Sequence, residues 1–303
     1  LNGRDPTPVD RIEALLSEVR TQLDARGETD SRARARLELE TSYVAIESDV
    51  PRALAAARAA VAIYRDRFPT DADYTQALSS LSVTLSRAGE RREARDTALR
   101  ALAVARDLRL APRHIAYLTR RAGEIHSLLG EVAQADALLA EALALSERVH
   151  GPRHPQTLAV RRTMFRHLAY SGRLLDAERL ADGFMDDLAS SDSGRELGLV
   201  QDSRRYLVEL MLMRGRVADA ERLVDDAFRD WGATPPETFE RADLELARAQ
   251  VALARGDLAR AEAAVAASAA VRAKLGLATS SLLGTNETLL RAELDLAARR
   301  PEA

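Results

Sequence analysis

Five glycines along this 303-residue chain are each followed, five residues later, by an alanine, and this spacing constrains the fold more than any other feature. The pairs are Gly89 and Ala94, Gly130 and Ala135, Gly172 and Ala177, Gly215 and Ala220, and Gly256 and Ala261. Ser48 with Ala53 fits the same frame, so the successive intervals are 41, 41, 42, 43 and 41 residues. A fixed period of this size is the signature of a repeat array.

The residues after each turn follow a helical pattern. Position nine is apolar in every unit, and position twelve is small except at Phe184. Two helices that cross at an axial distance of about 8–10 Å need a small side chain at the contact, which explains the alanine five residues after the turn. One hairpin alone would leave its apolar side exposed, so we expect the hairpins to stack and bury it.

The predicted organisation is a helical cap, six helical hairpins and a second cap. The cap over 1–30 carries one apolar stripe, Ile12, Leu15, Leu16, Val19 and Leu23, which we expect to face the first hairpin. The array spans 31–275, with units near 31–70, 71–111, 112–153, 154–194, 195–235 and 236–275, and the second cap spans 276–303. We expect one helix on each side of every turn, for example 156–171 and 174–188 in the fourth unit.

Composition excludes several classes of function. The formal net charge is −3, which does not favour direct binding to nucleic acid or to a membrane surface. The chain has no cysteine, and neither a signal peptide nor an apolar run of membrane-spanning length, so we expect a cytoplasmic protein. Lys274 is the single lysine among 44 Lys and Arg residues, which is typical of a high-GC bacterial coding bias. The start at Leu1 indicates a piece of a longer protein.

The recurring glycine, alanine and small or apolar positions resemble the second half of the tetratricopeptide repeat. The period of 41–43 residues and the loop HGPRHPQTL are similar to the longer repeats of kinesin light chains and of many bacterial regulators. The resemblance covers about residues 32–274. It implies an all-α, right-handed α-solenoid whose concave face is lined by the first helix of each hairpin and binds proteins. The family's aromatic positions in the first helix are replaced here by Leu37, Leu78, Thr119, Arg161, Arg204 and Glu245.

The resemblance also places residues ten and six before each turn in the groove. These are Glu38 and Ser42, Ser79 and Val83, Arg120 and Glu124, Arg162 and Arg166, Arg205 and Glu209, and Leu246 and Gln250. The middle of the groove is therefore rich in arginine. We predict that a partner contacts Tyr117, Arg120, Glu124, Arg162, Arg166, Arg205 and Glu209.

Two interpretations of these arginines stay open. Arg120 with Glu124, and Arg205 with Glu209, have i,i+4 spacing and can neutralise each other within one helix. Arg162 and Arg166 repel each other at the same spacing, so either neighbouring glutamates or a bound anionic group must offset the repulsion. Arginine binds carboxylates with two parallel hydrogen bonds, which suits an acidic peptide or domain as the partner.

No pattern of residues indicates catalysis, a cofactor or a metal ion. His150 and His154 flank a Gly-Pro loop without a third ligand nearby, so we interpret the loop as a start signal for the next helix. His126 lies at a packing position, while His114 and His167 lack a paired nucleophile or acid. We also expect Met211 and Met213 to pack in the core and Trp231 to pack at the loop that follows its helix.

The last helix carries two leucine stripes. Leu282, Leu289 and Leu296 form one, and Leu283, Leu290 and Leu294 form the other. A terminal cap needs a polar outer face, so we predict that this end contacts something more, with a homodimer as the candidate. Two functions follow: a non-catalytic scaffold that binds a peptide or domain as the regulatory part of a larger bacterial protein, or a structural oligomerisation module acting through its ends and convex face.

Overall fold

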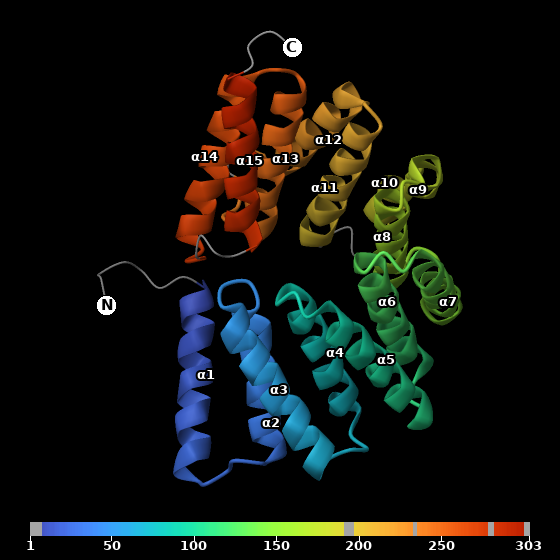
Figure 1. The fold of residues 1–303 in the computed structure, drawn as a ribbon, viewed down its shortest axis with the longest axis vertical. Helices are drawn as coiled ribbons and strands as arrows, with labels where there is room; N and C mark the ends of the chain where they lie inside the picture. The colour runs from blue at the N-terminus through green and yellow to red at the C-terminus, as the bar shows by residue number, and fades with distance from the viewer. Residues whose placement is uncertain (1–7, 191–196, 233–234, 278–281, 300–303) are drawn as a thin grey trace. The chain divides into compact units, whose positions relative to one another are not determined.

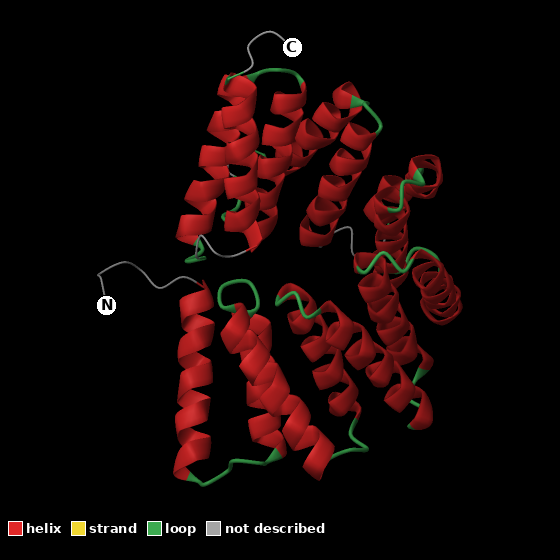
Figure 2. Ribbon diagram, in the orientation of Figure 1, coloured by secondary structure: helices red, strands yellow, loops and turns green. Residues whose placement is uncertain are grey.

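The computed structural model describes residues 8–190, 197–232, 235–277 and 282–299, and all regular structure in this part of the chain is α-helical (Figure 2). The helices divide into two compact units, Leu1–Thr163 and Met164–Ala303. The expected all-α solenoid is confirmed, because each unit consists of helical hairpins that pack against the next along the chain (Figure 1).

The first unit contains a leading helix and three hairpins. The helices are α1 (Pro8–Ala25), α2 (Arg32–Ala45), α3 (Val50–Arg67), α4 (Ala72–Arg87), α5 (Arg91–Asp107), α6 (Pro112–Leu128) and α7 (Val132–His150). Helix α8 (Pro155–Tyr170) begins in this unit and ends in the second. Local sequence sets several helix starts. Asp71 accepts a hydrogen bond from the backbone N–H of Asp73 at the start of α4, and Pro51 occupies the first turn of α3.

The second unit continues the series. Its helices are α9 (Leu174–Ala181), α10 (Phe184–Ala189), α11 (Leu197–Met213), α12 (Val217–Trp231), α13 (Phe239–Ala254), α14 (Leu258–Lys274) and α15 (Leu282–Ala298). Its C-terminal core is formed by α13, α14 and α15, with Leu246, Val265, Leu283, Leu290 and Leu294 among its buried side chains.

The alanine five residues after each turn lies at the closest approach of the two helices, as predicted. All six of these alanines are fully buried: Ala53, Ala94, Ala135, Ala177, Ala220 and Ala261. The turn glycines adopt positive φ angles, for example +83° at Gly89 and +73° at Gly130, which other residues rarely adopt. The sequence period therefore sets both the turn and the helix contact.

The packing predicted for the first helix is wrong. Of the apolar stripe on α1, Leu23 is buried, whereas Ile12, Leu15 and Val19 are exposed. The helix meets its neighbours through the adjacent side, where Arg20 Nη1 donates to Glu38 Oε1 at 2.6 Å and Arg52 pairs with Glu13. The contacts of α1 therefore combine these ion pairs with the burial of Leu23, while Ile12, Leu15 and Val19 lie outside them.

The second helix of the fourth hairpin is also not the single helix that was predicted. It ends at Ala181, the chain turns at Asp182 and Gly183, and α10 begins at Phe184. Gly183 has a φ of +67°, in the left-handed region. Phe184 occupies the position that is small in every other hairpin, and the break lets its ring enter the core, where it is fully buried.

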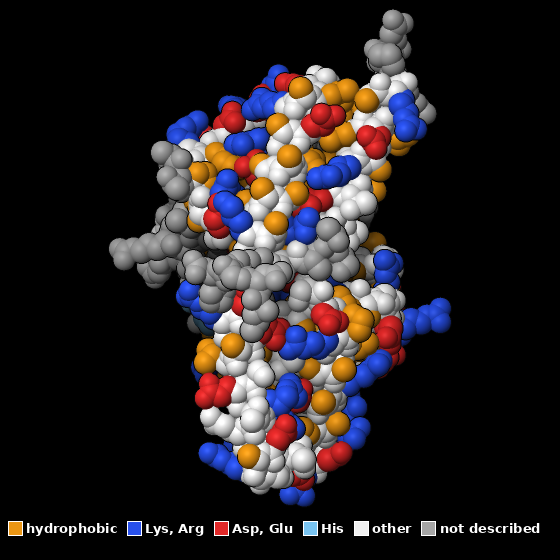
Figure 3. Space-filling model, turned by 90° about the vertical axis from the view of Figure 1, so that its left-hand side faces the viewer, with side chains coloured by type: hydrophobic (Ala, Val, Ile, Leu, Met, Phe, Trp, Pro, Cys, Tyr) orange, Lys and Arg blue, Asp and Glu red, His pale blue; other side chains and the backbone are white. Residues whose placement is uncertain are grey.

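Arginine–carboxylate pairs connect successive hairpins along the outer surface. They include Arg87 with Glu47, Arg58 with Glu90, Arg95 with Glu131, Arg106 with Glu141 and Arg260 with Glu221. Arginine and acidic side chains are accordingly interspersed on the face seen in Figure 3. Among the described residues, none of the helices has the length and apolar character needed to cross a bilayer.

Candidate partner-binding surface

Three of the predicted partner contacts lie on one side of α6, and together with Arg121 we call them the α6 cluster: Tyr117, Arg120, Arg121 and Glu124. Glu124 Oε2 accepts a hydrogen bond from Arg121 Nη1 at 2.7 Å, while Arg120 Nη1 lies 3.8 Å away from the same oxygen. The Arg120 guanidinium also lies 5.5 Å from the centroid of the Tyr117 ring, a cation–π contact. The Glu124 carboxylate is therefore closer to Arg121, which it hydrogen-bonds, than to Arg120.

The surroundings of Arg120 perturb its charge strongly. Its side chain is only 11% exposed, and within the described part of the chain it donates no hydrogen bond. Burial lowers the pKa of Arg120 to about 10, against an opposing effect of Glu124, and the positive charges of Arg121 and Arg162 lower it further. Arg120 is thus a largely desolvated charge that Glu124 compensates only in part.

A second tyrosine, Tyr43 on α2, is electrostatically coupled to this cluster. Burial of the Tyr43 hydroxyl, with a further effect from Tyr117, raises its pKa to about 12. Arg121 also influences Tyr43, so α2 and α6 contribute to the same surface. The site therefore combines arginine with two aromatic rings, a composition suited to recognising a polypeptide segment.

Three other predicted contacts, Arg166, Arg205 and Glu209, belong to a second group on α8, α11 and α13. We call it the α8–α11 cluster, and it also contains Tyr170, Tyr206 and Asp243. Arg166 Nη1 donates to the Tyr206 hydroxyl at 2.9 Å, and Arg166 Cζ lies 5.0 Å from the centroid of the same ring. The Arg205 guanidinium lies 3.7 Å from the same centroid. Tyr206 therefore contacts both arginines with its ring.

Carboxylates balance the charges in this second group. Arg205 Nε lies 2.6 Å from Asp243 Oδ2, and Arg205 Nη1 lies 3.6 Å from Glu209 Oε2. The Tyr170 hydroxyl donates to Glu209 Oε1 at 2.9 Å. Burial, followed by the negative charge of Glu209, raises the pKa of Tyr170. The α8–α11 cluster is a paired network, whereas Arg120 in the α6 cluster is not fully paired.

The two sequence interpretations of the arginines thus apply to different places. Internal pairing describes Arg205 and Glu209, while Arg120 keeps a charge that Glu124 only partly compensates. For Arg166, the Tyr206 hydroxyl and ring supply contacts that the sequence did not predict. Tyr206 follows Arg166 by 40 residues, nearly one repeat, and this spacing is the signal that could have revealed the contact.

Several positions assigned to the groove are instead buried. Glu38 is enclosed by its ion pairs with Arg20 and Arg34, and the Ser42 hydroxyl bonds with Ser80 of the next hairpin. Ser79 and Leu246 are also buried. Neighbouring helices cover these positions, so the accessible surface is narrower than the repeat pattern predicts.

The histidines fit structural roles. His126 is buried, as predicted, and its Nδ1 lies 2.5 Å from Glu131 Oε2. The rings of His150 and His154 stack 4.3 Å apart, and His154 Nδ1 accepts a hydrogen bond from the backbone N–H of Gln156, which confirms that the loop defines the start of α8. His114 Nε2 lies 2.7 Å from Thr75 Oγ1, and burial lowers its pKa. The described residues contain no group of three or more metal ligands.

Two further side chains differ in their packing. Met211 is buried as predicted, but Met213 is 44% exposed because it lies at the end of α11. The Trp231 ring packs edge-on against Phe228, with the ring centroids 5.3 Å apart.

The two leucine stripes of α15 differ in exposure. Leu283, Leu290 and Leu294 are buried, whereas Leu289 and Leu296 are exposed; the Leu282 side chain lies outside the described residues.

The fold and the site together define a class of protein. Helical hairpins of nearly constant length, joined in series and packed on one another, form an α-solenoid repeat protein. Residues 121–156 match the tetratricopeptide repeat family. Residues 121–156 therefore contain a tetratricopeptide repeat, set within a longer series of helical hairpins. A comparison with curated protein sequences finds no match.

Solved structures support the fold. BtubC (BKLC) from P. vanneervenii is 18% identical, with a TM-score of 0.60 over 76% of this chain and 93% of that one. The apo form of RapI is 17% identical, with a TM-score of 0.62 over 86% and 91% of the two chains. A Rap protein complexed with Competence and Sporulation Factor is 15% identical, with a TM-score of 0.57 over 93% of this chain and 70% of that one.

Proposed function

We propose that the protein is a non-catalytic scaffold that binds an acidic peptide or partner domain, with Arg120 at the centre of recognition. In this proposal it is the regulatory part of a larger, cytoplasmic bacterial protein. The single observation that supports this function is the state of Arg120, which is nearly buried, donates no hydrogen bond within the described residues and has a pKa lowered to about 10. The Rap protein complexed with Competence and Sporulation Factor gives a precedent for partner binding by a similar fold.

A carboxylate is the group that best completes this site. It can accept two parallel hydrogen bonds from the Arg120 guanidinium and restore the interactions that burial removes. The rings of Tyr117 and Tyr43 supply apolar area beside the charge at a low cost in conformational entropy. Two further predicted contacts act on the charge of Arg120: Glu124 raises its pKa, and Arg162 lowers it.

The test uses a fluorescein-labelled peptide of alternating Glu and Ala, with a Gln and Ala peptide as the neutral probe. Fluorescence anisotropy is expected to show binding of the Glu peptide alone, weakening as salt is added. Arg120→Gln should weaken binding about tenfold or more, because one charge-assisted pair is lost. Arg92→Gln removes the same charge from exposed α5 and should bind as the wild type does.

Equal affinity of Arg120→Gln and Arg92→Gln for the Glu peptide, with circular dichroism showing both proteins folded, would contradict the assignment. Binding of the Gln peptide with the same affinity would show that the surface recognises the backbone or the alanines instead of the carboxylate.

A second candidate function is self-association through α15. Leu289 and Leu296 lie one heptad apart and are 62% and 58% exposed, so this helix presents an apolar stripe beside the buried one. In this proposal a homodimer covers the stripe together with Leu282. Light scattering should give a dimeric mass for the wild type and a monomeric mass for Leu289→Glu, Leu296→Glu. A monomeric mass for both proteins would reject the dimer.

A further inference from the structure

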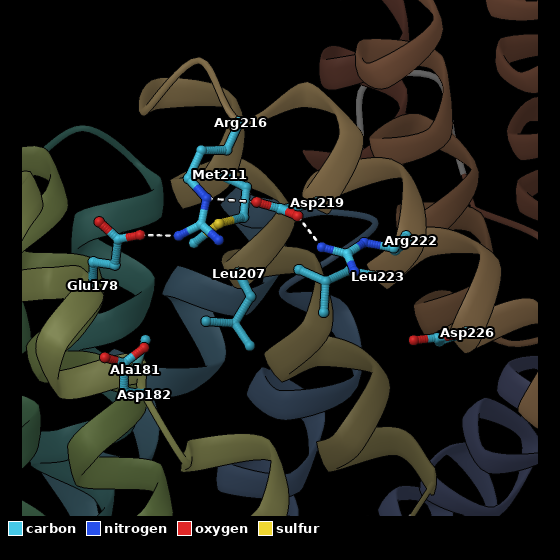
Figure 4. Close-up of a pocket in the computed structure, with 10 residues that line it drawn as sticks. All are labelled: Glu178, Ala181, Asp182, Leu207, Met211, Arg216, Asp219, Arg222, Leu223 and Asp226. Carbon is cyan, nitrogen blue, oxygen red and sulfur yellow. Dashed lines mark hydrogen bonds and ion pairs between the residues drawn. The ribbon is translucent and has the colours of Figure 1, made fainter.

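A pocket of about 290 Å³ opens within the second unit and is lined by residues of α9, α11 and α12 (Figure 4). One wall is α9, with Glu178, Ala181 and Asp182, and the facing wall is α12. The floor is apolar and is formed by Leu207 and Met211 of α11 with Leu223 of α12. Leu207 and Met211 are nearly buried, so the floor belongs to the packed interior.

The pocket arises from the break in the fourth hairpin. Helix α9 ends at Ala181, and the turn at Asp182 and Gly183 takes the chain away into α10. The wall on that side is therefore only two turns of helix long, and the apolar floor remains accessible below its end. Five other hairpins continue their second helix without interruption, so this feature occurs once among the described hairpins.

One rim of the pocket is closed by a chain of ion pairs, visible in Figure 4. Arg216 pairs with Glu178 on α9 and also donates from Nε to Asp219 Oδ2 at 2.5 Å. Asp219 in turn pairs with Arg222, and Arg214 Nε lies 3.2 Å from Glu178 Oε2. The charges on this rim are neutralised by neighbours and hold α9 against α12.

Each wall of the pocket also carries a carboxylate that the chain does not neutralise in the same way. Within the described part of the chain, Asp182 has no ion pair or hydrogen bond from its side chain. It also lies at the C-terminus of α9, the negative end of the helix dipole, where a carboxylate is disfavoured and a cation is favoured. Across the pocket, Asp226 pairs with Arg229, which is 72% exposed at i,i+3 spacing, and such a surface pair is weak.

We propose that this pocket binds the side chain of an arginine or lysine from an exposed segment of a partner protein. The aliphatic stem of such a residue packs on Leu207, Met211 and Leu223 while its charged head lies in the field of the Asp182 and Asp226 carboxylates, one on each wall. The volume lies at the lower end of the range for small-molecule pockets and suits one long side chain. The pocket is separate from Arg120 and takes the opposite charge, so it stands or falls independently of the proposed function.

The test uses acetyl-arginine-methylamide as the probe and acetyl-citrulline-methylamide as its neutral isostere. The protein is labelled with ¹³C at the methionine methyl groups, because Met211 lines the floor and reports occupancy directly. Titration with the arginine probe should move the Met211 resonance with a dissociation constant on the order of 1 mM. The citrulline probe should bind at least about fivefold more weakly, since it lacks the charge.

Two double variants separate the pocket from general surface charge. Asp182→Asn, Asp226→Asn removes both rim carboxylates and should weaken the arginine probe about tenfold. Asp186→Asn, Asp225→Asn removes two carboxylates from α10 and α12 that do not line the pocket, and it should leave the titration unchanged. Equal shifts with both probes, or an unchanged titration in Asp182→Asn, Asp226→Asn, would overturn the proposal.

Discussion

The ring of Phe184 packs edge-on against the ring of Phe165, with centroids 5.5 Å apart and an interplanar angle of 77°. Both rings are almost completely buried. Phe184 takes the position of a small residue in the other hairpins. The break at Gly183 therefore accompanies the aromatic pair, because it makes room for the large ring. A continuous helix would bring the large ring into the close contact that a small residue normally occupies.

Phe184→Ala is expected to reduce the free energy of unfolding by about 3–5 kcal/mol, because a buried aromatic ring is replaced by a cavity. Urea denaturation followed by circular dichroism measures the change. Leu175→Ala on α9 is the matched control, since Leu175 is 61% exposed and should cost no more than about 0.5 kcal/mol. Similar losses in the two variants would show that Phe184 is not part of the core.

Gly123 and Leu139 are expected to be energetically coupled. A Cβ at Gly123 would lie 2.8 Å from Leu139 Cγ and Cδ2, so Gly123→Ala must displace that side chain. Overpacking costs about 1–3 kcal/mol, which outweighs the gain of about 1 kcal/mol from alanine in a helix.

A double-mutant cycle with Leu139→Ala measures this coupling by chemical denaturation. The double variant should be more stable than the sum of the single losses by at least about 1 kcal/mol, because the smaller residue at 139 makes room for the new methyl group. Additive losses would mean that the backbone, rather than Leu139, absorbs the strain.

Glu287→Gln is expected to destabilise the docking of α15 by about 3 kcal/mol. Glu287 accepts hydrogen bonds from Arg272 Nε at 3.0 Å and from Ser268 Oγ at 3.1 Å, and the exposed fractions of the Arg272 and Glu287 side chains are 12% and 5%. Loss of the carboxylate leaves Arg272 buried without its counter-charge. Limited proteolysis within α15, together with urea denaturation, reports the effect.

The control for this pair lies on the surface of the same unit. Lys274 Nζ and Glu237 Oε1 lie 2.8 Å apart, but the two side chains are 63% and 40% exposed. Glu237→Gln should therefore change the free energy of unfolding by less than about 1 kcal/mol. A larger effect at 237 than at 287 would reverse the assignment of the buried pair.

Glu245 is expected to make stability depend on pH. Burial raises the pKa of Glu245 above its ordinary value of 4.5, although Arg248 and Arg241 oppose the shift. A raised pKa means that the folded state holds the proton more tightly than the unfolded chain does, so ionisation above this pKa costs stability.

Glu245→Gln should therefore be more favourable, relative to the wild type, at pH 7 than at pH 4. The difference in melting temperature between the two proteins at each pH measures this trend. A relative stability that improves on acidification would indicate that the ion pair with Arg248, 3.1 Å away, outweighs desolvation.

The sequence period predicts the hairpins because turn and contact repeat together. Glycine at each turn and alanine five residues later leave little freedom in how two helices cross, and both features are visible without a structure. The side of α1 that packs was not predictable in this way. Its apolar stripe is clear, but its contacts also include the ion pairs of Arg20 with Glu38 and of Arg52 with Glu13, and such long-range pairs leave no periodic signal.

In the candidate site, too, positions within one helix are predictable from the sequence, whereas contacts between helices are not. Tyr117, Arg120 and Glu124 share a helix, so helical geometry alone places them on one side. The contacts of Arg166 with Tyr206 and of Arg205 with Asp243 join different helices, and their formation depends on the exact register between hairpins. The pocket beside Asp182 is even less predictable from the sequence, because it lies where a helix ends earlier than its pattern predicts.

The interruption between α9 and α10 also has a consequence for how the chain folds. In a linear array of repeats, each folded repeat stabilises its neighbours through the interface that they share. A shorter interface therefore gives weaker coupling between neighbouring repeats. Segments of eight and six residues cannot sustain helical structure by themselves and rely entirely on their surroundings. The cooperativity of folding is therefore weakest at the fourth hairpin, and we expect local unfolding inside the array to begin there.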